Sequence, residues 1–190
     1  MNSKKIISII VFILAAIGGK LAYDEFFKES EIVSFELSDW SIRSYLGAQF
    51  ESPFELSTME VPLPPSVKQY VKVMENYKYE SNPISLVISR AEYVEGISVD
   101  LDGAVKGSNQ NMSASKEISD YSYESKPINK NLLEGRLVNG TCKVKGKEAE
   151  FIAEYYKSDL KLMWVCCLYL KHDENRDIKD RIMNSLKITL

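Results

Sequence analysis

The segment that most constrains the fold is a run of nine residues, from Leu162 to Leu170, that contains no charged side chain. Side chains of a β-strand alternate between its two faces, so a strand here is apolar on both. Such a strand lies in the middle of a sheet whose two faces are both covered, and helices can provide that cover. The run predicts an α+β fold in which a mostly antiparallel sheet is covered by helices on both faces, an α/β/α sandwich.

The size of the chain limits how many such units it can form. It has 190 residues, of which 45% are hydrophobic and 27% charged. A chain of this length and composition buries one good core but not two. We therefore expect a single folded domain, and we place it at residues 40–190.

Four strand-like segments and a helix are expected in the second half of this domain. Turn-prone residues separate the segments at a spacing of roughly 10–12 residues, which indicates an antiparallel meander. A helix should follow, with acids in its first turn and Ile178, Ile182 and Leu186 facing inward. The expected elements are strands at Tyr121–Ile128, Leu137–Val144, Ala149–Lys157 and Leu160–Leu170, and a helix at Asp173–Ser185.

The first half shows weaker patterns of mixed type. Two strands are expected at Ile42–Leu46 and Phe50–Leu56, and a hairpin should join Tyr77–Tyr79 to Ile84–Tyr93 through a turn at Ser81-Asn82-Pro83. Two amphipathic helices are expected beside them. The first has Val67, Tyr70, Val71 and Met74 on one face. The second has Leu101, Ala104, Val105, Ser108 and Met112 on one face and Asp100, Asp102, Lys106 and Asn109 off it.

The N-terminus carries an export signal. Lys4 and Lys5 precede an uncharged apolar run from Ile6 to Gly19, a pattern typical of a signal peptide or membrane anchor. A transmembrane helix needs roughly 20 residues, and the run reaches a marginal length if it continues to Tyr23. We favour an uncleaved anchor over residues 1–23, with a cleaved signal peptide as the alternative. Residues 24–39 would form a stalk.

This arrangement sets the expected location. The two lysines should stay in the cytoplasm, and the domain should lie outside. For a bacterial protein this means a single-pass protein of the inner membrane, or a soluble exported one if the signal is cleaved. The formal net charge of −3, and the lack of a basic stripe with interleaved aromatics, argue against a nucleic-acid partner.

The sequence has three cysteines and few residues suited to catalysis. Cys166 and Cys167 are adjacent and should face opposite sides of a strand, so only one could pair with Cys142. Buried free thiols are the favoured interpretation, and a bridge to Cys142 is the alternative. The single histidine, His172, should be a solvated or capping residue. Asp100-Leu101-Asp102-Gly103 lacks the later ligands of a calcium loop and should be the first turn of a helix. No cofactor or metal site is predicted.

The element order resembles the PsbP/DcrB-like family of small α/β/α sandwich domains over residues 40–190. The resemblance implies that fold and an accessory or binding role, because members are better known as partners than as enzymes. Fold alone does not establish a function. The residues that carry it are Gly47-x-x-Phe50-x-Ser52-Pro53-Phe54, the Tyr93 strand followed by Leu101-Asp102-Gly103-Ala104, and the Trp164 strand followed by Arg181-Ile182-Met183-Asn184-Ser185-Leu186.

These observations favour a non-enzymatic, membrane-tethered extracytoplasmic domain that binds a protein or a small ligand. One alternative is a binder of hydrophobic segments, similar to an effector chaperone, although such proteins act in the cytoplasm. Another is an envelope enzyme of unrecognised type, which a cleft joining Glu150 or Glu154 to His172 would favour. Tyrosines suit interfaces. The candidate partner surface comprises Tyr77, Tyr79, Tyr121, Tyr123, Tyr155 and Tyr156.

Overall fold

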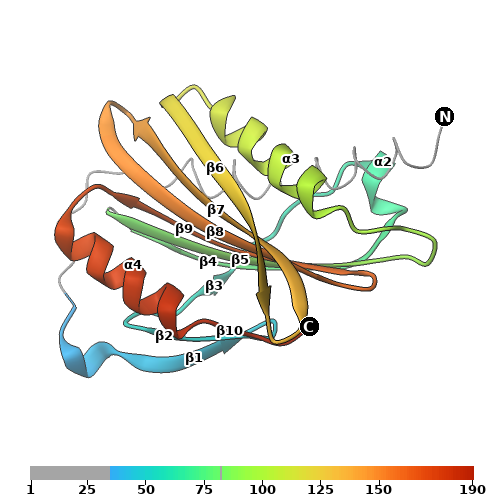
Figure 1. Ribbon diagram of the computed structural model, residues 1–190, viewed down its shortest axis with the longest axis horizontal. Helices are drawn as coiled ribbons and strands as arrows, with labels where there is room; N and C mark the ends of the chain where they lie inside the picture. Colours follow the sequence, from blue (N-terminus) through green and yellow to red (C-terminus); the bar gives the residue numbers. More distant parts are fainter. Residues whose placement is uncertain (1–34, 82) are drawn as a thin grey trace.

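The computed structural model describes residues 35–190 except residue 82, and it shows an α+β fold (Figure 1). Its main feature is a seven-stranded antiparallel sheet with the strand order β3-β4-β5-β9-β8-β7-β6. The strands are β3 (Ser57–Thr58), β4 (Val71–Glu80), β5 (Ile84–Tyr93), β6 (Ile118–Lys130), β7 (Leu133–Val144), β8 (Lys147–Ser158) and β9 (Lys161–Leu170).

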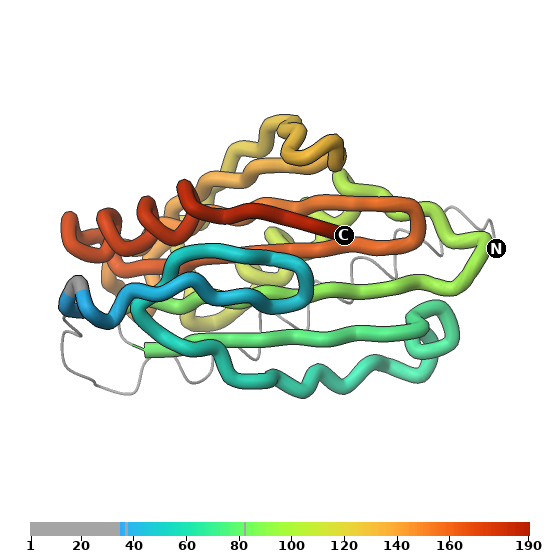
Figure 2. The backbone as a smooth tube through the Cα atoms, turned by 90° about the horizontal axis from the view of Figure 1, so that it is seen from below, coloured from blue at the N-terminus to red at the C-terminus, as the bar shows by residue number. Residues whose placement is uncertain are grey.

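Different elements cover the two faces of this sheet. The helix α3 (Leu101–Ser113) lies along one face, over β6, β7 and β8, and the short helix α2 (Pro65–Lys68) adjoins β4. The other face is covered by α4 (Asp173–Ser185) and by a three-stranded sheet, as Figures 1 and 2 show. We call these the α3 face and the α4 face. The predicted α+β fold with an antiparallel sheet covered on both faces is therefore confirmed for the described residues, but the second sheet that shares the α4 face with the helix was not predicted.

The small sheet joins the two ends of the domain. Its order is β1-β2-β10, with β1 at Ser41–Tyr45, β2 at Ala48–Ser52 and β10 at Lys187–Ile188, and a 3-10 helix, η1 (Leu37–Asp39), precedes it. Gly47 turns the chain between β1 and β2 with a φ of +97°. A Cβ at Gly47 would lie 2.1 Å from the carbonyl oxygen of Thr189, so this crossing requires glycine.

The central strand β9 behaves as its sequence predicts. Trp164, Cys166 and Leu168 belong to the core under α3, whereas Val165 and Cys167 belong to the core under α4. Neighbouring β5 and β8 pair with β9 along its whole length. The side chains of one strand thus contribute to two hydrophobic clusters, and each cluster buries the apolar side of the helix that covers it.

Most of the other predicted elements are confirmed. The hairpin, the four-stranded meander and the helix at Asp173–Ser185 are present, and the first three meander strands are longer than predicted. The strand expected at Phe50–Leu56 ends at Ser52, just before Pro53. The packed part begins by Phe35, inside the expected stalk, because its ring lies 5.7 Å from that of Phe54.

Two predictions about helices are wrong in detail. Only one turn of helix forms at Pro65–Lys68, and Val71 and Met74 lie in β4, where Met74 pairs with Ala91 of β5. Pairing with a long neighbouring strand outweighs the helical spacing, and β-branched Val71 and Val73 favour the strand. In α3, Asn109 is buried rather than off the packed face, because its amide donates to the carbonyl of Val105 at 2.7 Å.

The anchor or signal peptide at residues 1–23 and most of the stalk lie outside the described residues. Within residues 35–190, apart from 82, no helix has the length and apolar content to span a membrane.

The three cysteines are free and buried. Cys142 and Cys166 lie in the core under α3 and Cys167 in the core under α4, so the favoured interpretation is confirmed and the bridge to Cys142 is not formed. Burial raises the pKa of Cys142 to about 11 and that of Cys166 to about 12. It also raises the pKa of Cys167 well above that of an exposed thiol.

These thiols should resist alkylation in the native protein. At pH 8, a thiol with a pKa of about 11 is a thiolate in only about one molecule in a thousand, and burial also keeps reagents away. We expect mass spectrometry to detect no iodoacetamide adduct in native protein and three adducts after denaturation without reductant. Labelling of native protein would contradict the burial, and a failure to label denatured protein would reveal a disulfide.

Candidate functional site

The six candidate tyrosines do not form one surface. Tyr155 and Tyr156 are buried on opposite faces of β8. The Tyr155 hydroxyl is hydrogen-bonded to that of Ser108 in α3, and the Tyr156 hydroxyl donates to Glu154. These two tyrosines therefore stabilise the core, and the prediction that they face a partner is wrong.

The other four tyrosines are more exposed but lie at two separate places. Tyr77 and Tyr79 are half-buried on the α4 face of β4, where the Tyr79 ring stacks on Phe54 at 3.7 Å. Tyr121 stacks on Phe151 on the α3 face, with ring centroids 5.4 Å apart. Of the six, only Tyr123 is exposed, with 44% of its surface accessible.

Of the residues considered for catalysis or metal binding, His172 is solvated, whereas Glu150 and Asp100 make structural hydrogen bonds. His172 is exposed at the N-terminus of α4, and Glu150 accepts a hydrogen bond from Tyr169 at 2.7 Å. Asp100 caps α3 by accepting from the Asp102 amide at 3.1 Å, as expected for the first turn of a helix. The described part of the chain holds no cluster of three potential metal ligands.

A groove of about 440 Å³ runs along β6, β7 and β8 on the α4 face. Glu150, Tyr169 and Lys179 line it together with exposed polar groups of β6 and β7, but His172 does not. The groove therefore lacks the pairing of Glu150 with histidine that would favour an enzyme.

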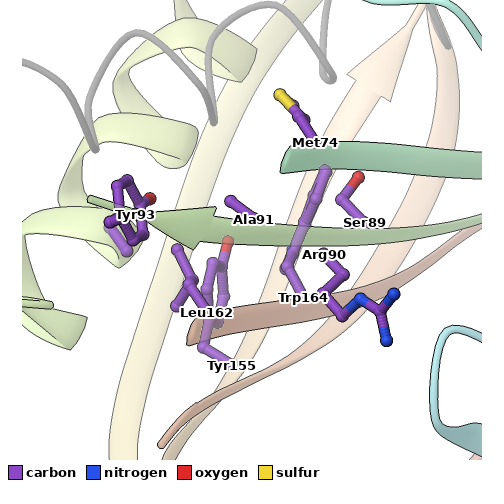
Figure 3. A pocket seen from close by; sticks show the side chains of 9 residues that line it. Met74, Ser89, Arg90, Ala91, Tyr93, Tyr155, Leu162 and Trp164 are labelled. Carbon is purple, nitrogen blue, oxygen red and sulfur yellow. The ribbon is translucent and has the colours of Figure 1, made fainter. Parts of the chain in front are cut away.

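A second hollow lies on the α3 face, between the sheet and the start of α3 (Figure 3). Its volume is about 30 Å³, and it is open to solvent on one side. Strand alternation places Ser89 and Ala91 on this side and Arg90 on the other, where its guanidinium bonds to Glu75 at 2.5 Å. The lining residues are Met74, Ser89, Arg90, Ala91, Tyr93, Ala104, Tyr155, Leu162 and Trp164.

Three polar groups that line this cavity have no hydrogen-bond partner among the described residues. They are the hydroxyls of Ser89 and Tyr93 and the indole Nε1 of Trp164, and the three residues are 9%, 0% and 7% exposed. The Trp164 N–H lies near enough to the Tyr155 hydroxyl to influence its pKa, but the two groups do not have hydrogen-bond geometry. Buried polar groups are normally paired, so an unpaired group at a cavity indicates a place where a ligand or an ordered water binds.

The small size of two residues creates the space. Ala91 on β5 and Ala104 on α3 are both buried and both line the cavity, together with Trp164 and Leu162 on β9. Met74, which is half-buried, adjoins them and has a flexible side chain. Burial raises the pKa of the Tyr93 hydroxyl far above the usual tyrosine value, so it stays protonated and can donate.

One feature near the cavity fixes the start of α3. Arg136 of β7 contacts both carboxylate oxygens of Asp102, at 2.7 and 3.2 Å. This bidentate pair holds the helix over the sheet, and it lowers the pKa of Asp102 and raises that of Arg136 through the hydrogen bonds.

The sequence contains one signal for this cavity, in the residues of β5. In β5 the side chains facing α3 are Ser85, Val87, Ser89, Ala91 and Tyr93, whereas those facing α4 include Ile84, Leu86 and Ile88. The successive small residues Ser89 and Ala91 on the α3 face indicate space on that face. The location of the cavity also depends on Ala104 of α3, which comes close to β5 and β9 only in the folded protein.

The hydroxyl of Tyr93 should contribute no stability to the empty protein. Because it has no partner, Tyr93→Phe removes an unpaired polar group, and the free energy of unfolding should stay unchanged or rise by up to about 1 kcal/mol. Tyr155→Phe is the matched control, since it loses the bond to Ser108 and should lower the free energy by about 1 kcal/mol. Urea unfolding measures both. An equal loss in the two variants would show that Tyr93 has a partner.

Comparison with solved structures finds proteins of similar fold. No protein-family model and no curated protein matches the sequence. The solution structure of cyanobacterial PsbP (CyanoP) from Synechocystis sp. PCC 6803 is similar, with 11% identity, a TM-score of 0.50, and coverage of 84% of this chain and 98% of that one.

Two further structures show weaker similarity. A protein of unknown function from Pseudomonas aeruginosa has 13% identity and a TM-score of 0.37, and covers 69% of this chain and 83% of its own. LpqN, involved in cell envelope biogenesis of Mycobacterium tuberculosis, has 12% identity and a TM-score of 0.41, and the match covers 84% of this chain and 83% of LpqN. At such identities the likeness to CyanoP concerns the fold alone, and it confirms the PsbP-like architecture predicted from the sequence.

Proposed function

We propose that this chain is a non-enzymatic accessory domain that acts outside the cytoplasm and binds a small, largely apolar ligand between β5, β9 and α3. The observation that carries the proposal is the set of three unpaired buried polar groups lining one cavity, those of Ser89, Tyr93 and Trp164. A buried polar group without a partner costs about 1–3 kcal/mol, and a ligand that completes the hydrogen bonds recovers this energy.

The lining defines the chemistry of the ligand. Ala91, Ala104 and Leu162 give apolar walls, so most of the ligand surface should be apolar. The Trp164 N–H can only donate, so the ligand needs at least one acceptor, whereas the Ser89 and Tyr93 hydroxyls can donate or accept. A small flat molecule with a carbonyl or hydroxyl oxygen meets these conditions, and a displacement of Met74 would provide the room that it needs.

The location outside the cytoplasm follows from the N-terminal sequence. Lys4 and Lys5 before the apolar run favour an orientation in which the following domain is exported. CyanoP supports this proposal only through its fold, because identity of 11% carries no location or partner.

A protein partner is part of the same proposal. Of the six candidate tyrosines, only Tyr123 is exposed, so a partner surface rich in tyrosine would have to centre on β6. Tyr77 and Tyr79 contribute less because their rings pack against Tyr45 and Phe54.

Ligand binding can be tested through Trp164. Trp40, the only other tryptophan, is replaced by Phe so that Trp164 alone reports. We expect some members of a panel of small aromatic alcohols, ketones and amides to shift Trp164 emission saturably and to raise the melting temperature. Unchanged emission across the whole panel would contradict the proposal.

A variant that fills the cavity provides the control for this experiment. Ala91→Leu occupies the space beside Trp164 and should weaken binding by about tenfold or more. Ala114→Leu, at the exposed end of α3, makes the same chemical change away from the cavity and should leave binding unchanged. Equal affinity in the two variants would place the ligand elsewhere.

Export can be tested by fractionation of the full chain expressed in a bacterial host. We expect the full-length mass in the membrane fraction and digestion by protease added to intact spheroplasts, because the domain lies outside and the anchor is retained. A shortened soluble exported product would mean that the signal is cleaved. Protection from protease until the cells are lysed would contradict export and favour a cytoplasmic binder of hydrophobic segments.

A further inference from the structure

The outer edge of β6 is open. It is the last strand on one side of the seven-stranded sheet, and at 13 residues it is longer than any other described strand. All side chains from Ser122 to Pro127 are exposed, so in the described part of the chain nothing covers this stretch. The other edge strand, β3, has only two residues. An open, extended edge offers backbone N–H and C=O groups that another strand can pair with.

The regular part of this edge is short and has defined ends. A bulge between Ser119 and Ser122 interrupts it on one side, with Asp120 at a φ of +52°. Pro127, which has no N–H, interrupts it on the other side. Bulges and prolines of this kind prevent indefinite edge pairing. They limit any ladder to a short segment, Tyr123–Pro127, whose last residue cannot donate a hydrogen bond.

The charges of this segment are complementary to themselves. Glu124 and Lys126 flank Ser125, and neither forms an ion pair within the described residues. Residues directly opposite each other in antiparallel strands have their side chains on the same face of the sheet. When two identical strands are related by a twofold axis, this holds only if the axis passes between the two copies of one residue. An axis through Glu124 or through Lys126 places like charges opposite each other. An axis through Ser125 places Glu124 opposite Lys126 of the second copy, twice.

The neighbouring residues fit the same register. With the axis at Ser125, the exposed ring of Tyr123 lies opposite Pro127 of the second copy, again twice. Opposite charges and aromatic contacts across antiparallel strands stabilise pairing, and like charges directly opposite destabilise it. The register with its axis at Ser125 is therefore favoured over the two registers whose axis lies one residue away, at Glu124 or at Lys126.

We propose that the partner of β6 is β6 of a second copy of this chain, paired antiparallel about Ser125, so that two seven-stranded sheets join into one. In this interface, the ring of Tyr123 contacts Pro127 of the second copy. It also leaves the cavity between β5, β9 and α3 free in each copy, because that cavity lies on other strands. Dimer formation is thus independent of the ligand proposed above.

Charge exchange tests the register. Sedimentation velocity of the full chain in mild detergent should show a concentration-dependent dimer. Glu124→Lys and Lys126→Glu should each raise the dissociation constant about tenfold or more, because each places like charges opposite, and the double variant should restore pairing. Glu95→Lys, in an exposed loop away from β6, is the matched control and should have no effect. A monomer at all concentrations, or a dimer insensitive to the single reversals, would overturn the proposal.

Cross-linking tests the position of the axis. The native cysteines are buried, so Ser125→Cys introduces the one exposed thiol of the described residues. A short bis-maleimide should convert this variant to a species of twice the chain mass. Ser57→Cys, on the opposite edge strand of the same sheet, should cross-link far more slowly. Equal rates in the two variants would overturn the proposed axis.

Discussion

The rest of the structure depends on the need to cover a strand that is apolar on both faces. Because β9 contributes side chains to two cores, neither face of the sheet can remain in water. The chain supplies α3 to one face, and α4 with the small sheet to the other. The cavity between β5, β9 and α3 is a consequence of this division, since it lies where α3 approaches the centre of the sheet over small residues.

Much of this architecture could be predicted from the sequence because its signals are local. The apolar run of β9, the regular spacing of the meander and the helical periodicity of α3 and α4 each follow from residues close together in the chain. The helix predicted through Val71 and Met74 failed because its spacing also fits a strand, and pairing with β5 decided between the two. The two-residue strand β10 could not be predicted, because it depends on a distant partner, β2.

The candidate site was less predictable because it depends on residues that are distant in the sequence. Tyrosine content indicated a surface, but exposure depends on which face a strand turns to the core, and Tyr155 and Tyr156 are adjacent residues buried in different cores. The cavity depends on a coincidence of small residues on β5 and α3, and on hydroxyls whose lack of partners only the folded arrangement reveals. Ser89 and Tyr93 have no unusual feature in the sequence on their own.

The pairing of β10 with β2 affects how the protein can fold as it is made. Lys187 and Ile188 pair with Gln49 and Ala48, and the amide of Thr189 donates to the carbonyl of Gly47 at 2.8 Å. The small sheet can therefore be completed only after β10 has been synthesised, and the cover over the α4 face is completed with it. Closure of the α4 face thus depends on a strand that follows all seven strands of the main sheet in the chain.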